Sequence, residues 1–280
     1  MVREIRTQGG PGRFVLFYGR DRPAYIIRAP ADRHQPPEPL PMDLSVVIPA
    51  YNEALRLGPS LRQIVSYLTR KGGTWEVLVV DDGSTDGTAR VAAAVATELA
   101  APGVRVLRQE VNRGKGAVIK AGVLASRGRE VLLVDADLST PIEDVEKLRP
   151  HLAEAPLVFG SRAVAGADIQ QHQPFYRETM GRVFNLIIRL LGVRGLRDTQ
   201  CGFKLLDGEA ARRLFTEMTI ERFAYDVELV WLARRHGHRV AEVGVRWADS
   251  SSSKVNPLSD SARMFWDVLA LRWRDLRGGR

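Results

Sequence analysis

Acidic residues follow three apolar segments of this 280-residue chain, within 49–53, 81–86 and 135–139. Asp135 and Asp137 are two residues apart, and in an extended segment such side chains project to the same side. Two carboxylates that face one cleft repel each other unless a cation lies between them. Carboxylate oxygens are preferred ligands of hard divalent cations, which also bind phosphate oxygens. The sequence therefore predicts that Asp135 and Asp137 bind Mg2+ or Mn2+ beside a phosphorylated substrate.

Helix capping is the alternative role for these acids. Ser139 or Thr140 before Pro141 is a typical helix start, and Asp86 could cap a helix over 87–99. A cap uses one residue rather than a pair on one face, so the spacing of Asp135 and Asp137 favours the metal site. For Asp86 both roles remain open.

The elements that must position these acids alternate regularly along the first half of the chain. Apolar runs typical of strands are followed by segments with helical periodicity. Strands are expected over 44–48, 75–80, 104–107 and 130–134, and helices over 59–71, 86–99 and 115–126. This alternation predicts an α/β fold with a parallel, Rossmann-like sheet, helices on both faces and ligands at the carboxyl ends of the strands.

The second half has a mixed pattern that predicts an acceptor-binding region. We expect strands over 157–160 and 202–206, an antiparallel edge strand over 239–247, and helices over 175–193, 225–235 and 258–277. Residues 1–43 differ from the rest, because two short β-prone runs, 14–18 and 25–27, precede a proline-rich link over 35–41. We expect an N-terminal extension with a hairpin, then a donor-binding half over 44–156 and an acceptor-binding half over 157–280.

The composition indicates which kinds of binding partner and which cellular compartment the protein is suited to. There are 41 lysines and arginines against 33 acidic residues, a net charge of +8, which favours nucleic acid, anionic lipid or a phosphorylated substrate. The arginines are scattered rather than interleaved with aromatic residues on one element, which argues against nucleic acid. Cys201 is the single cysteine, so no intrachain disulfide forms, and a reducing cytoplasm fits best.

Four further classes of protein lose support. No apolar run reaches the ~18–20 residues that a membrane-spanning helix needs, and the first residues lack the apolar region of a signal peptide. Neither a P-loop nor a Gly-x-Gly-x-x-Gly motif follows the first expected strand, which argues against ATP hydrolases and dinucleotide-binding enzymes.

Short motifs follow one another along most of the chain. They are Val-Val-Ile-Pro-Ala-Tyr-Asn-Glu (46–53), Val-Val-Asp-Asp-Gly-Ser-Thr-Asp-Gly-Thr (79–88), Asn-Arg-Gly-Lys-Gly (112–116), Asp-Ala-Asp-Leu-Ser (135–139), Gly-Ser-Arg (160–162), Met-Gly-Arg-Val-Phe-Asn (180–185), Asp-Thr-Gln-Cys-Gly-Phe-Lys (198–204), Ala-Tyr-Asp-Val-Glu (224–228) and Ser-Lys-Val (253–255). Taken in this order, the motifs resemble an inverting family 2 glycosyltransferase with the GT-A fold. The resemblance covers roughly residues 44–275 and is closest to the dolichyl-phosphate β-glucosyltransferases of the polyprenyl-phosphate branch, with the mannose synthases next.

The resemblance implies a nucleotide-sugar site in the first half. Asp137 would be the principal metal ligand and Asp135 would touch the ribose or the metal. A surface-turn lysine is the alternative for Lys115. The nucleotide site would be lined by Pro49, Ala50, Tyr51, Glu53, Asp81, Asp82, Lys115, Asp135 and Ala136.

The acceptor decides whether a general base is needed. A hydroxyl acceptor must lose a proton, for which Asp226 or Glu228 is the candidate base. A phosphate monoester has a second pKa near 6 and attacks unaided at neutral pH, so it needs cations instead. The resemblance places Arg162, Arg177, Gln200 and Lys254 on the acceptor side. Arginine forks suit phosphate, although each of these arginines could instead form a surface salt bridge.

Two expected helices carry a pattern that suits a membrane surface. Helix 175–193 has apolar residues along one side and Arg182 and Arg189 on the other, and helix 258–277 carries Trp266 and Trp273 seven residues apart. Basic amphipathic helices with tryptophan are typical of proteins that lie at the lipid interface. The alternative is that both helices are ordinary amphipathic helices packed on the sheet.

Taken together, the sequence predicts a metal-dependent, inverting hexosyltransferase that acts at the membrane surface. It would move glucose from UDP-glucose to a polyprenyl phosphate, as a peripheral protein at the inner, cytoplasmic face of the membrane. GDP-mannose as donor, a soluble hydroxyl acceptor with Asp226 as base, and a non-catalytic scaffold that binds nucleotide-sugars remain alternatives. Two features depart from the family pattern. Serines occupy 250–253, where the family commonly has a glycine before Ser-Lys, and residues 1–43 are an unmatched extension.

Overall fold

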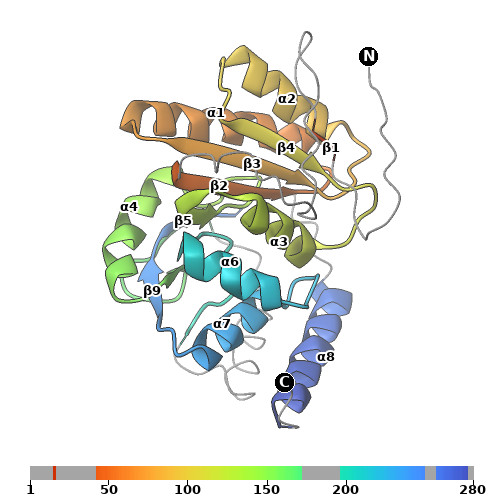
Figure 1. The fold of residues 1–280 in the computed structure, drawn as a ribbon, viewed down its shortest axis with the longest axis vertical. Coiled ribbons are helices and arrows are strands. Elements are labelled where there is room, and N and C mark those ends of the chain that lie inside the picture. The colour runs from red at the N-terminus through yellow and green to blue at the C-terminus, as the bar shows by residue number, and fades with distance from the viewer. Residues whose placement is uncertain (1–14, 17–41, 172–195, 250–256, 277–280) are drawn as a thin grey trace, which may run out of the picture.

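The computed structural model describes residues 15–16, 42–171, 196–249 and 257–276 (Figure 1). Its centre is a sheet with strand order β1-β4-β3-β2-β5-β8-β6-β9. Four neighbouring strands from the first half run parallel: β4 (Val104–Arg108), β3 (Trp75–Asp81), β2 (Met42–Ala50) and β5 (Gly128–Leu133). The predicted α/β fold with a mostly parallel sheet is confirmed.

The central strands are apolar along nearly their whole length because both faces of the sheet are covered. Successive residues of β2 point to opposite faces, so Val46 and Ile48 enter one hydrophobic cluster and Val47 enters the other. On the first face lie α1 (Ala54–Lys71) and α2 (Thr88–Glu98). On the second face lie α3 (Lys115–Ala125), α6 (Gly208–Glu217), α7 (Tyr225–Arg235) and α8 (Pro257–Leu276).

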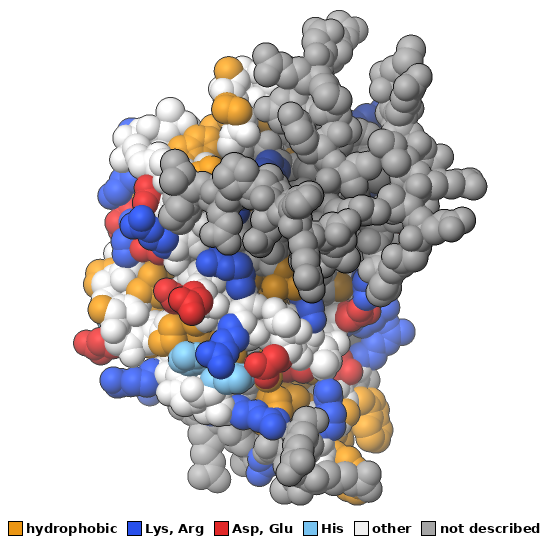
Figure 2. Space-filling view, viewed as in Figure 1, with side chains coloured by type: hydrophobic (Ala, Val, Ile, Leu, Met, Phe, Trp, Pro, Cys, Tyr) orange, Lys and Arg blue, Asp and Glu red, His pale blue; other side chains and the backbone are white. Residues whose placement is uncertain are grey.

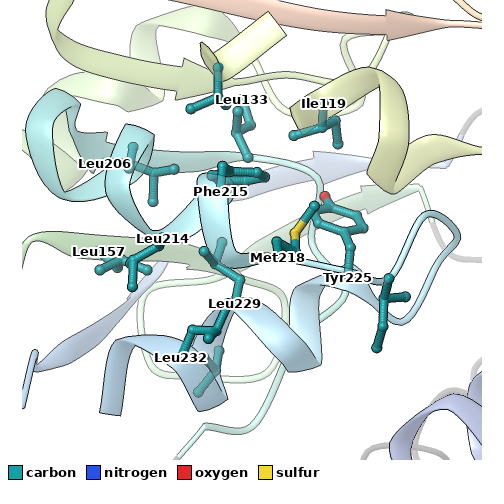
Figure 3. Close-up of a cluster of buried hydrophobic side chains, with 14 of the residues drawn as sticks. Ile119, Leu133, Leu157, Leu206, Leu214, Phe215, Met218, Tyr225, Leu229 and Leu232 are labelled. Atoms are coloured by element: carbon teal, nitrogen blue, oxygen red, sulfur yellow. The ribbon is translucent and has the colours of Figure 1, made fainter. Parts of the chain in front are cut away.

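The second cluster joins the two halves of the chain (Figure 3). Ile119 and Leu133 from the first half meet Leu157, Leu206 and Phe215 from the second half. At Gly122 the helix α3 comes so close to the sheet that an added Cβ would lie 2.4 Å from a methyl group of Val47. The close helix and sheet packing behind the site therefore depends on that glycine.

The strands of the second half extend the same sheet. β8 (Lys204–Asp207) lies between β5 and β6 (Leu157–Ser161) and runs antiparallel to both, and β9 (Val240–Gly244) pairs with β6. A separate two-stranded sheet is formed by β7 (Asp168–Gln171) and β10 (Arg246–Ala248). Short helical turns, η1 (Ile142–Asp144), α4 (Val145–Leu148) and η2 (Arg149–Ala153), connect β5 to β6.

One strand prediction is wrong in direction. The strand expected to be antiparallel over 239–247 is two strands, and β9 runs parallel to β6 at the sheet edge. The chain crosses from β8 through the helices α6 and α7 into β9, which runs opposite to β8. Because β8 is itself antiparallel to β6, β9 is parallel to β6. After Val245 the chain leaves the large sheet and β10 pairs with β7.

The other predicted elements in the described residues agree with the structure to within a few residues. The expected helix over 175–193 and the β-prone run 25–27 lie outside the described residues. Of the expected N-terminal hairpin, the structure describes only β1 (Val15–Leu16), which pairs antiparallel with β4. Among the described helices, none is both long and apolar enough to cross a bilayer.

Candidate active site at the carboxyl ends of the parallel strands

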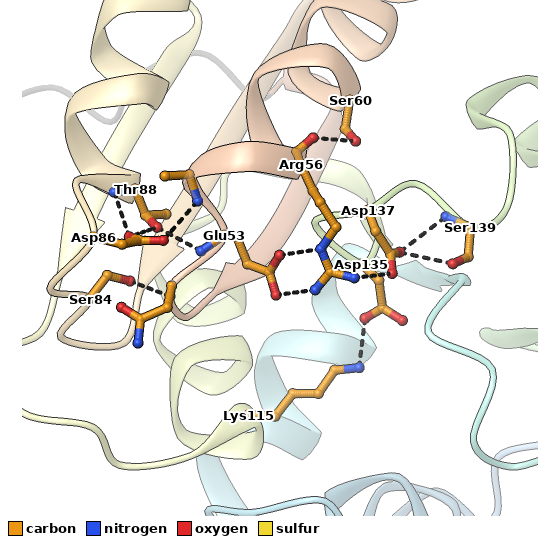
Figure 4. A network of polar contacts seen from close by, with 12 residues as sticks. Glu53, Arg56, Ser60, Ser84, Asp86, Thr88, Lys115, Asp135, Asp137 and Ser139 are labelled. Atoms are coloured by element: carbon orange, nitrogen blue, oxygen red, sulfur yellow. Dashed lines mark hydrogen bonds and ion pairs between the residues drawn. The ribbon is translucent and has the colours of Figure 1, made fainter. Parts of the chain in front are cut away.

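The turns after β2 and β3 are joined to each other by hydrogen bonds. The backbone N–H of Asn52 donates to Oγ of Ser84 at 2.8 Å, and that of Glu53 donates to Oγ1 of Thr88 at 2.7 Å. Asp86 accepts from the N–H groups of Thr88 and of Ala54 at the start of α1, at 3.0 and 3.1 Å (Figure 4). Asp86 therefore takes the helix-start role.

Two acids at the end of β3 that were predicted to bind the nucleotide accept hydrogen bonds from backbone N–H groups. Asp82 accepts hydrogen bonds from the N–H groups of Arg113 and Gly114, both at 2.8 Å. Burial raises the pKa of Asp82 and outweighs these two N–H donors, which lower it. Asp81 is fully buried, accepts from the N–H of Ser84 at 3.0 Å and lies 3.3 Å from Nε of Arg108. Asp82 therefore fixes the turn over 112–116 beside the sheet edge, whereas Asp81 holds the turn after β3.

Asp135 faces the lysine of that turn. Nζ of Lys115, the first residue of α3, lies 2.6 Å from Oδ1 of Asp135. The surface-turn alternative for Lys115 is therefore wrong. Burial is the largest influence on the pKa of Asp135 and raises it, but Lys115, Lys204 and Arg162 together hold it below its ordinary value. An added Cβ at Gly202 would come within 2.0 Å of Oδ2, so the carboxylate lies directly on that backbone.

Asp137 is bound to an arginine that the sequence analysis did not identify. Arg56 donates from Nε and Nη2 to the two carboxylate oxygens of Glu53, at 2.7 and 2.5 Å, and from Nη1 to Oδ2 of Asp137 at 3.2 Å (Figure 4). It therefore connects a predicted nucleotide-binding residue with a predicted metal ligand. Its position three residues after Glu53 on a helix is a signal that could have revealed the first contact.

The two aspartates lie beyond the strand rather than in it. β5 ends at Leu133, and Asp135 accepts the N–H of Leu138 through its carbonyl at 3.0 Å in a turn where Leu138 has φ of 50°. The turn, not the alternation of an extended strand, directs both carboxylates to the site. Oδ1 of Asp137 also accepts from the N–H and Oγ of Ser139 at 3.2 and 2.9 Å.

The carboxylate oxygens of Asp135 and Asp137 are ligands that suit Mg2+ or Mn2+. Two carboxylates supply hard oxygen ligands, and these cations commonly complete their coordination with water and substrate phosphates. The side chains of Asp135 and Asp137 remain 36% and 19% exposed, so both can be reached from solvent. Within the described ranges, no group of three or more His, Cys, Asp or Glu side chains forms a complete protein-only metal site.

The remaining nucleotide-binding candidates surround these turns. Tyr51 is 42% exposed, Ala50 and Ala136 are buried, and Pro49 is partly buried at the end of β2. A cavity of about 510 Å³ lies beside the ends of β3 and β4 and the start of α2, and among the described nucleotide-binding candidates Asp81 alone lines it. Its lining includes Asp81, Ser84, Thr88 and Arg108.

On the acceptor side, Arg162 already binds a carboxylate. Its Nε and Nη2 donate to the two oxygens of Asp198 at 2.7 and 2.9 Å, and its guanidinium lies 5.2 Å from the centre of the Trp247 ring. Burial lowers the pKa of Arg162, but Asp198 outweighs it and the net shift is upward. The backbone N–H of Gln200 donates to Oδ1 of Asp198 at 3.1 Å, so Gln200 belongs to the same group.

The candidate base Asp226 is enclosed. Only 4% of the residue is exposed, and its Oδ1 lies 2.8 Å from Nζ of Lys204, whose side chain is fully buried. Lys204 also donates to the carbonyl of Cys201 and lies 4.9 Å from the centre of the Phe159 ring. Burial raises the pKa of Asp226, although the lysine opposes the shift. Lys204 ends the motif over 198–204, but the sequence analysis gave it no role, because a single lysine in an expected strand does not indicate a buried partner.

The other acceptor-side predictions have different outcomes. Glu228 accepts from the N–H groups of Thr219 and Ile220 at 2.9 and 2.6 Å, which gives it a structural role. Arg177 and Lys254 lie outside the described residues.

Comparison with known sequences matches residues 45–215 to the family model described as glycosyl transferase family 2. The chain is 36% identical over 272 residues to a dolichyl-phosphate beta-glucosyltransferase from Dictyostelium discoideum, covering 91% of this chain and 83% of that protein. It is 38% identical over 247 residues to the enzyme of the same name from Homo sapiens, covering 84% and 76%.

Solved structures share the fold. Glucosyl-3-phosphoglycerate synthase from Mycobacterium tuberculosis, in complex with phosphoglyceric acid, superposes with a TM-score of 0.63 at 22% identity, covering 82% of this chain and 80% of that one. The same enzyme has been crystallised with Mn2+ and UDP-glucose, with a TM-score of 0.59 at 21% identity and coverage of 82% and 79%. Mannosyl-3-phosphoglycerate synthase from Rubrobacter xylanophilus gives a TM-score of 0.61 at 20% identity, covering 85% and 74%.

Proposed function

This chain belongs to glycosyl transferase family 2, and we propose that it transfers glucose from UDP-glucose to a polyprenyl phosphate such as dolichyl phosphate. The most similar relatives described above carry that acceptor and that sugar in their names and align over most of this chain. A glucosyltransferase of the same fold binds UDP-glucose and Mn2+, and the names of the sequence relatives support glucose over mannose.

The observation that carries the choice of acceptor is the enclosure of Asp226 by Lys204. A hydroxyl acceptor requires a base that can reach it, and Asp226 is 4% exposed while Glu228 is 1% exposed and bonded to backbone. A phosphate acceptor is mostly dianionic at neutral pH and needs no base. The burial of both candidate bases therefore favours the phosphate acceptor.

Transfer then proceeds by direct displacement with inversion. An oxygen of the lipid phosphate attacks C1 of the glucose from the face opposite the nucleotide. The bond from C1 to the diphosphate oxygen breaks, and UDP departs with the electron pair. A divalent cation held by Asp135 and Asp137 would offset the charge that develops on the leaving diphosphate.

The residues of the chain itself prepare this geometry. Lys115 and Arg56 neutralise Asp135 and Asp137 and direct them toward the strand ends. Asp82 holds the turn that carries Lys115, through the N–H groups of Arg113 and Gly114. Because dolichyl phosphate resides in a bilayer, the enzyme would act as a peripheral protein at the cytoplasmic face of the membrane.

The proposal is tested by incubating the protein with UDP-glucose, Mn2+ and a short-chain polyprenyl phosphate, and by identifying products by mass spectrometry. A glucosyl phospholipid is expected, and GDP-mannose in parallel should give much less product. Soluble sugar and alcohol acceptors provide a further arm, in which product would instead support a hydroxyl-directed enzyme. Hydrolysis of the donor without any lipid product, across several nucleotide-sugars, would refute the proposed function.

A further inference from the structure

Helix α8 packs on the protein through one face. Met264, Val268 and Leu271 are at most 7% exposed and belong to the second hydrophobic cluster, in which α8 contacts α7. Their spacing of three and four residues places them along one side of the helix. An ordinary amphipathic helix that packs in this way carries polar residues on its opposite side.

The opposite side of α8 is apolar instead. Trp266 and Trp273 are seven residues apart, share one face and are 68% and 59% exposed. The residues between them on that face are the partly buried Leu269 and the exposed Ala270. The ring of Phe265 packs edge-on against Trp266 with centroids 5.9 Å apart. The helix therefore has two apolar sides, of which one is turned to solvent.

Basic side chains flank this exposed side. Between 263 and 274, the part of α8 whose side chains are described, Arg263, Arg272 and Arg274 are exposed and Asp267 is the one acid, a net charge of 3 − 1 = +2. Arg274 also donates to Oγ1 of Thr219 at 3.0 Å, which holds its guanidinium beside the helix. Figure 2 shows hydrophobic and basic side chains next to each other at the lower right, over α8.

We propose that the face of α8 formed by Trp266, Leu269, Ala270 and Trp273 binds the surface of a membrane that contains anionic lipid. Tryptophan is enriched at the level of the lipid headgroups, and arginines beside an apolar stripe pair with anionic headgroups. The proposal rests on the proposed function, which requires a lipid-borne acceptor. It adds the element that contacts the bilayer.

The size of the face distinguishes a membrane from a second copy of the chain. Two tryptophans bury at most about 500 Å² together, whereas a stable interface buries about 800 Å² on each partner. A membrane has no such requirement, because several weak insertions and headgroup contacts act together, and arginines near an anionic surface add to the attraction.

Vesicle flotation without nucleotide or acceptor tests the proposal. The full-length protein should float with phosphatidylcholine vesicles that contain 30% phosphatidylserine, bind pure phosphatidylcholine more weakly, and dissociate as salt is raised. Replacing both tryptophans (W266A/W273A) should weaken binding about tenfold or more. The matched control is L99A/L124A, which removes two side chains that are 37% and 43% exposed on other elements and should bind like the parent protein.

A second measurement detects the contact of the tryptophans with lipid directly. Brominated lipids in the vesicles should quench part of the tryptophan fluorescence of the parent protein, and W266A/W273A should lose that quenching. Equal flotation of parent and W266A/W273A, or flotation that ignores anionic lipid, would overturn the proposal. So would a parent dimer in light scattering that becomes a monomer in W266A/W273A, since the face would then bind a second copy.

The outcome is separable from the proposed function. If α8 binds the bilayer, W266A/W273A should keep its activity toward a water-soluble, short-chain polyprenyl phosphate and lose most activity toward dolichyl phosphate in vesicles. Membrane binding without any lipid product refutes the proposed function alone. Product formation with unchanged vesicle binding in the variant refutes the α8 proposal alone.

Discussion

The ion pairs at the proposed donor site and the pair of Lys204 and Asp226 in the acceptor half differ in their access to water. At the donor end the side chains of Lys115 and Asp135 are 24% and 36% exposed, and those of Arg56 and Asp137 are 20% and 19% exposed. In the acceptor half Lys204 is fully buried and its partner Asp226 is 6% exposed at the side chain. Ion pairs between a basic residue and an aspartate therefore occur in two environments, one partly exposed to solvent and one buried.

This difference indicates which pairs can be exchanged for a ligand. Partly exposed charges can separate at modest cost, because water solvates each partner when the pair opens. A buried pair loses its partner only by leaving an uncompensated charge in the interior. We therefore interpret the pairs of Asp135 and Asp137 as replaceable by a metal and a diphosphate, and the pair of Lys204 and Asp226 as a permanent part of the scaffold.

The largest expected effect is on the buried pair. Lys204→Met leaves Asp226 buried without its cation and should lower the free energy of unfolding by about 3–5 kcal/mol. Urea denaturation measures this change. The matched control is Arg62→Ala, which breaks a pair with Glu98 whose side chains are 46% and 52% exposed and should cost about 0–1 kcal/mol. Equal costs for the two variants would remove the contrast.

The next effect is on Asp137, the proposed metal ligand. Asp137→Asn should lower kcat/KM for UDP-glucose by more than about 100-fold, because a direct ligand matters more than the supporting residues, whose loss costs 10–100-fold. Its circular dichroism spectrum and melting temperature should stay close to those of the parent. Asp168→Asn, at an exposed acid on β7, is the control and should keep full activity. Full activity in Asp137→Asn would exclude the metal assignment.

A smaller effect is expected for the arginine that joins the donor site. Arg56→Gln should lower kcat/KM for UDP-glucose about tenfold, because Glu53 and Asp137 lose the group that orients both. Arg56→Lys should recover little, since lysine lacks the bidentate fork. Arg70→Gln, on the same helix at an arginine whose side chain is 68% exposed, serves as the control. An unchanged Arg56→Gln enzyme would show that the bridge is dispensable.

The smallest effect concerns Glu146, a partly exposed carboxylate, and the pH dependence of its contribution to stability. Burial alone would raise the pKa of Glu146, but Tyr67, Lys71 and Arg149 lower it from 4.5 to about 2. A lowered pKa gives stability that is present above pH 4.5 and lost as the pH falls toward 2. The side chain is 38% exposed, so solvent screening limits the gain to less than about 1 kcal/mol.

Urea titrations of Glu146→Gln at several pH values measure that contribution. The variant should be less stable than the parent at pH 7, and the difference should vanish near pH 2. A difference that grows in acid would contradict the sign of the shift.

The helices and strands could be predicted because the spacing of apolar residues reflects which side of each element is buried. Helix α7 begins and ends where its periodicity does, at Tyr225 and Arg235, and the parallel strands appear as continuous apolar runs because both faces are covered. The carboxylates at 135 and 137 could be placed at the site because the ends of parallel strands share one edge.

The partners of those carboxylates could not be predicted, because pairing depends on proximity in the fold. Arg56 and Asp137 are 81 residues apart in the chain, and no spacing rule connects them. Lys204 is typical of an exposed strand residue until β8 is placed between β5 and β6, where no water reaches it. The parallel direction of β9 likewise depends on the crossover that precedes it.

The position of β8 has a mechanical consequence. Its ladder pairs Glu130 to Leu133 of β5 with Asp207 to Lys204, and its other edge bonds to β6. The strands that carry the proposed donor residues and those that carry the proposed acceptor residues therefore belong to one continuous sheet, with no hinge between them. Rotation of one half against the other would break the hydrogen bonds of the middle strands. The two substrates must therefore be aligned by loops and ligands at the edge of the sheet.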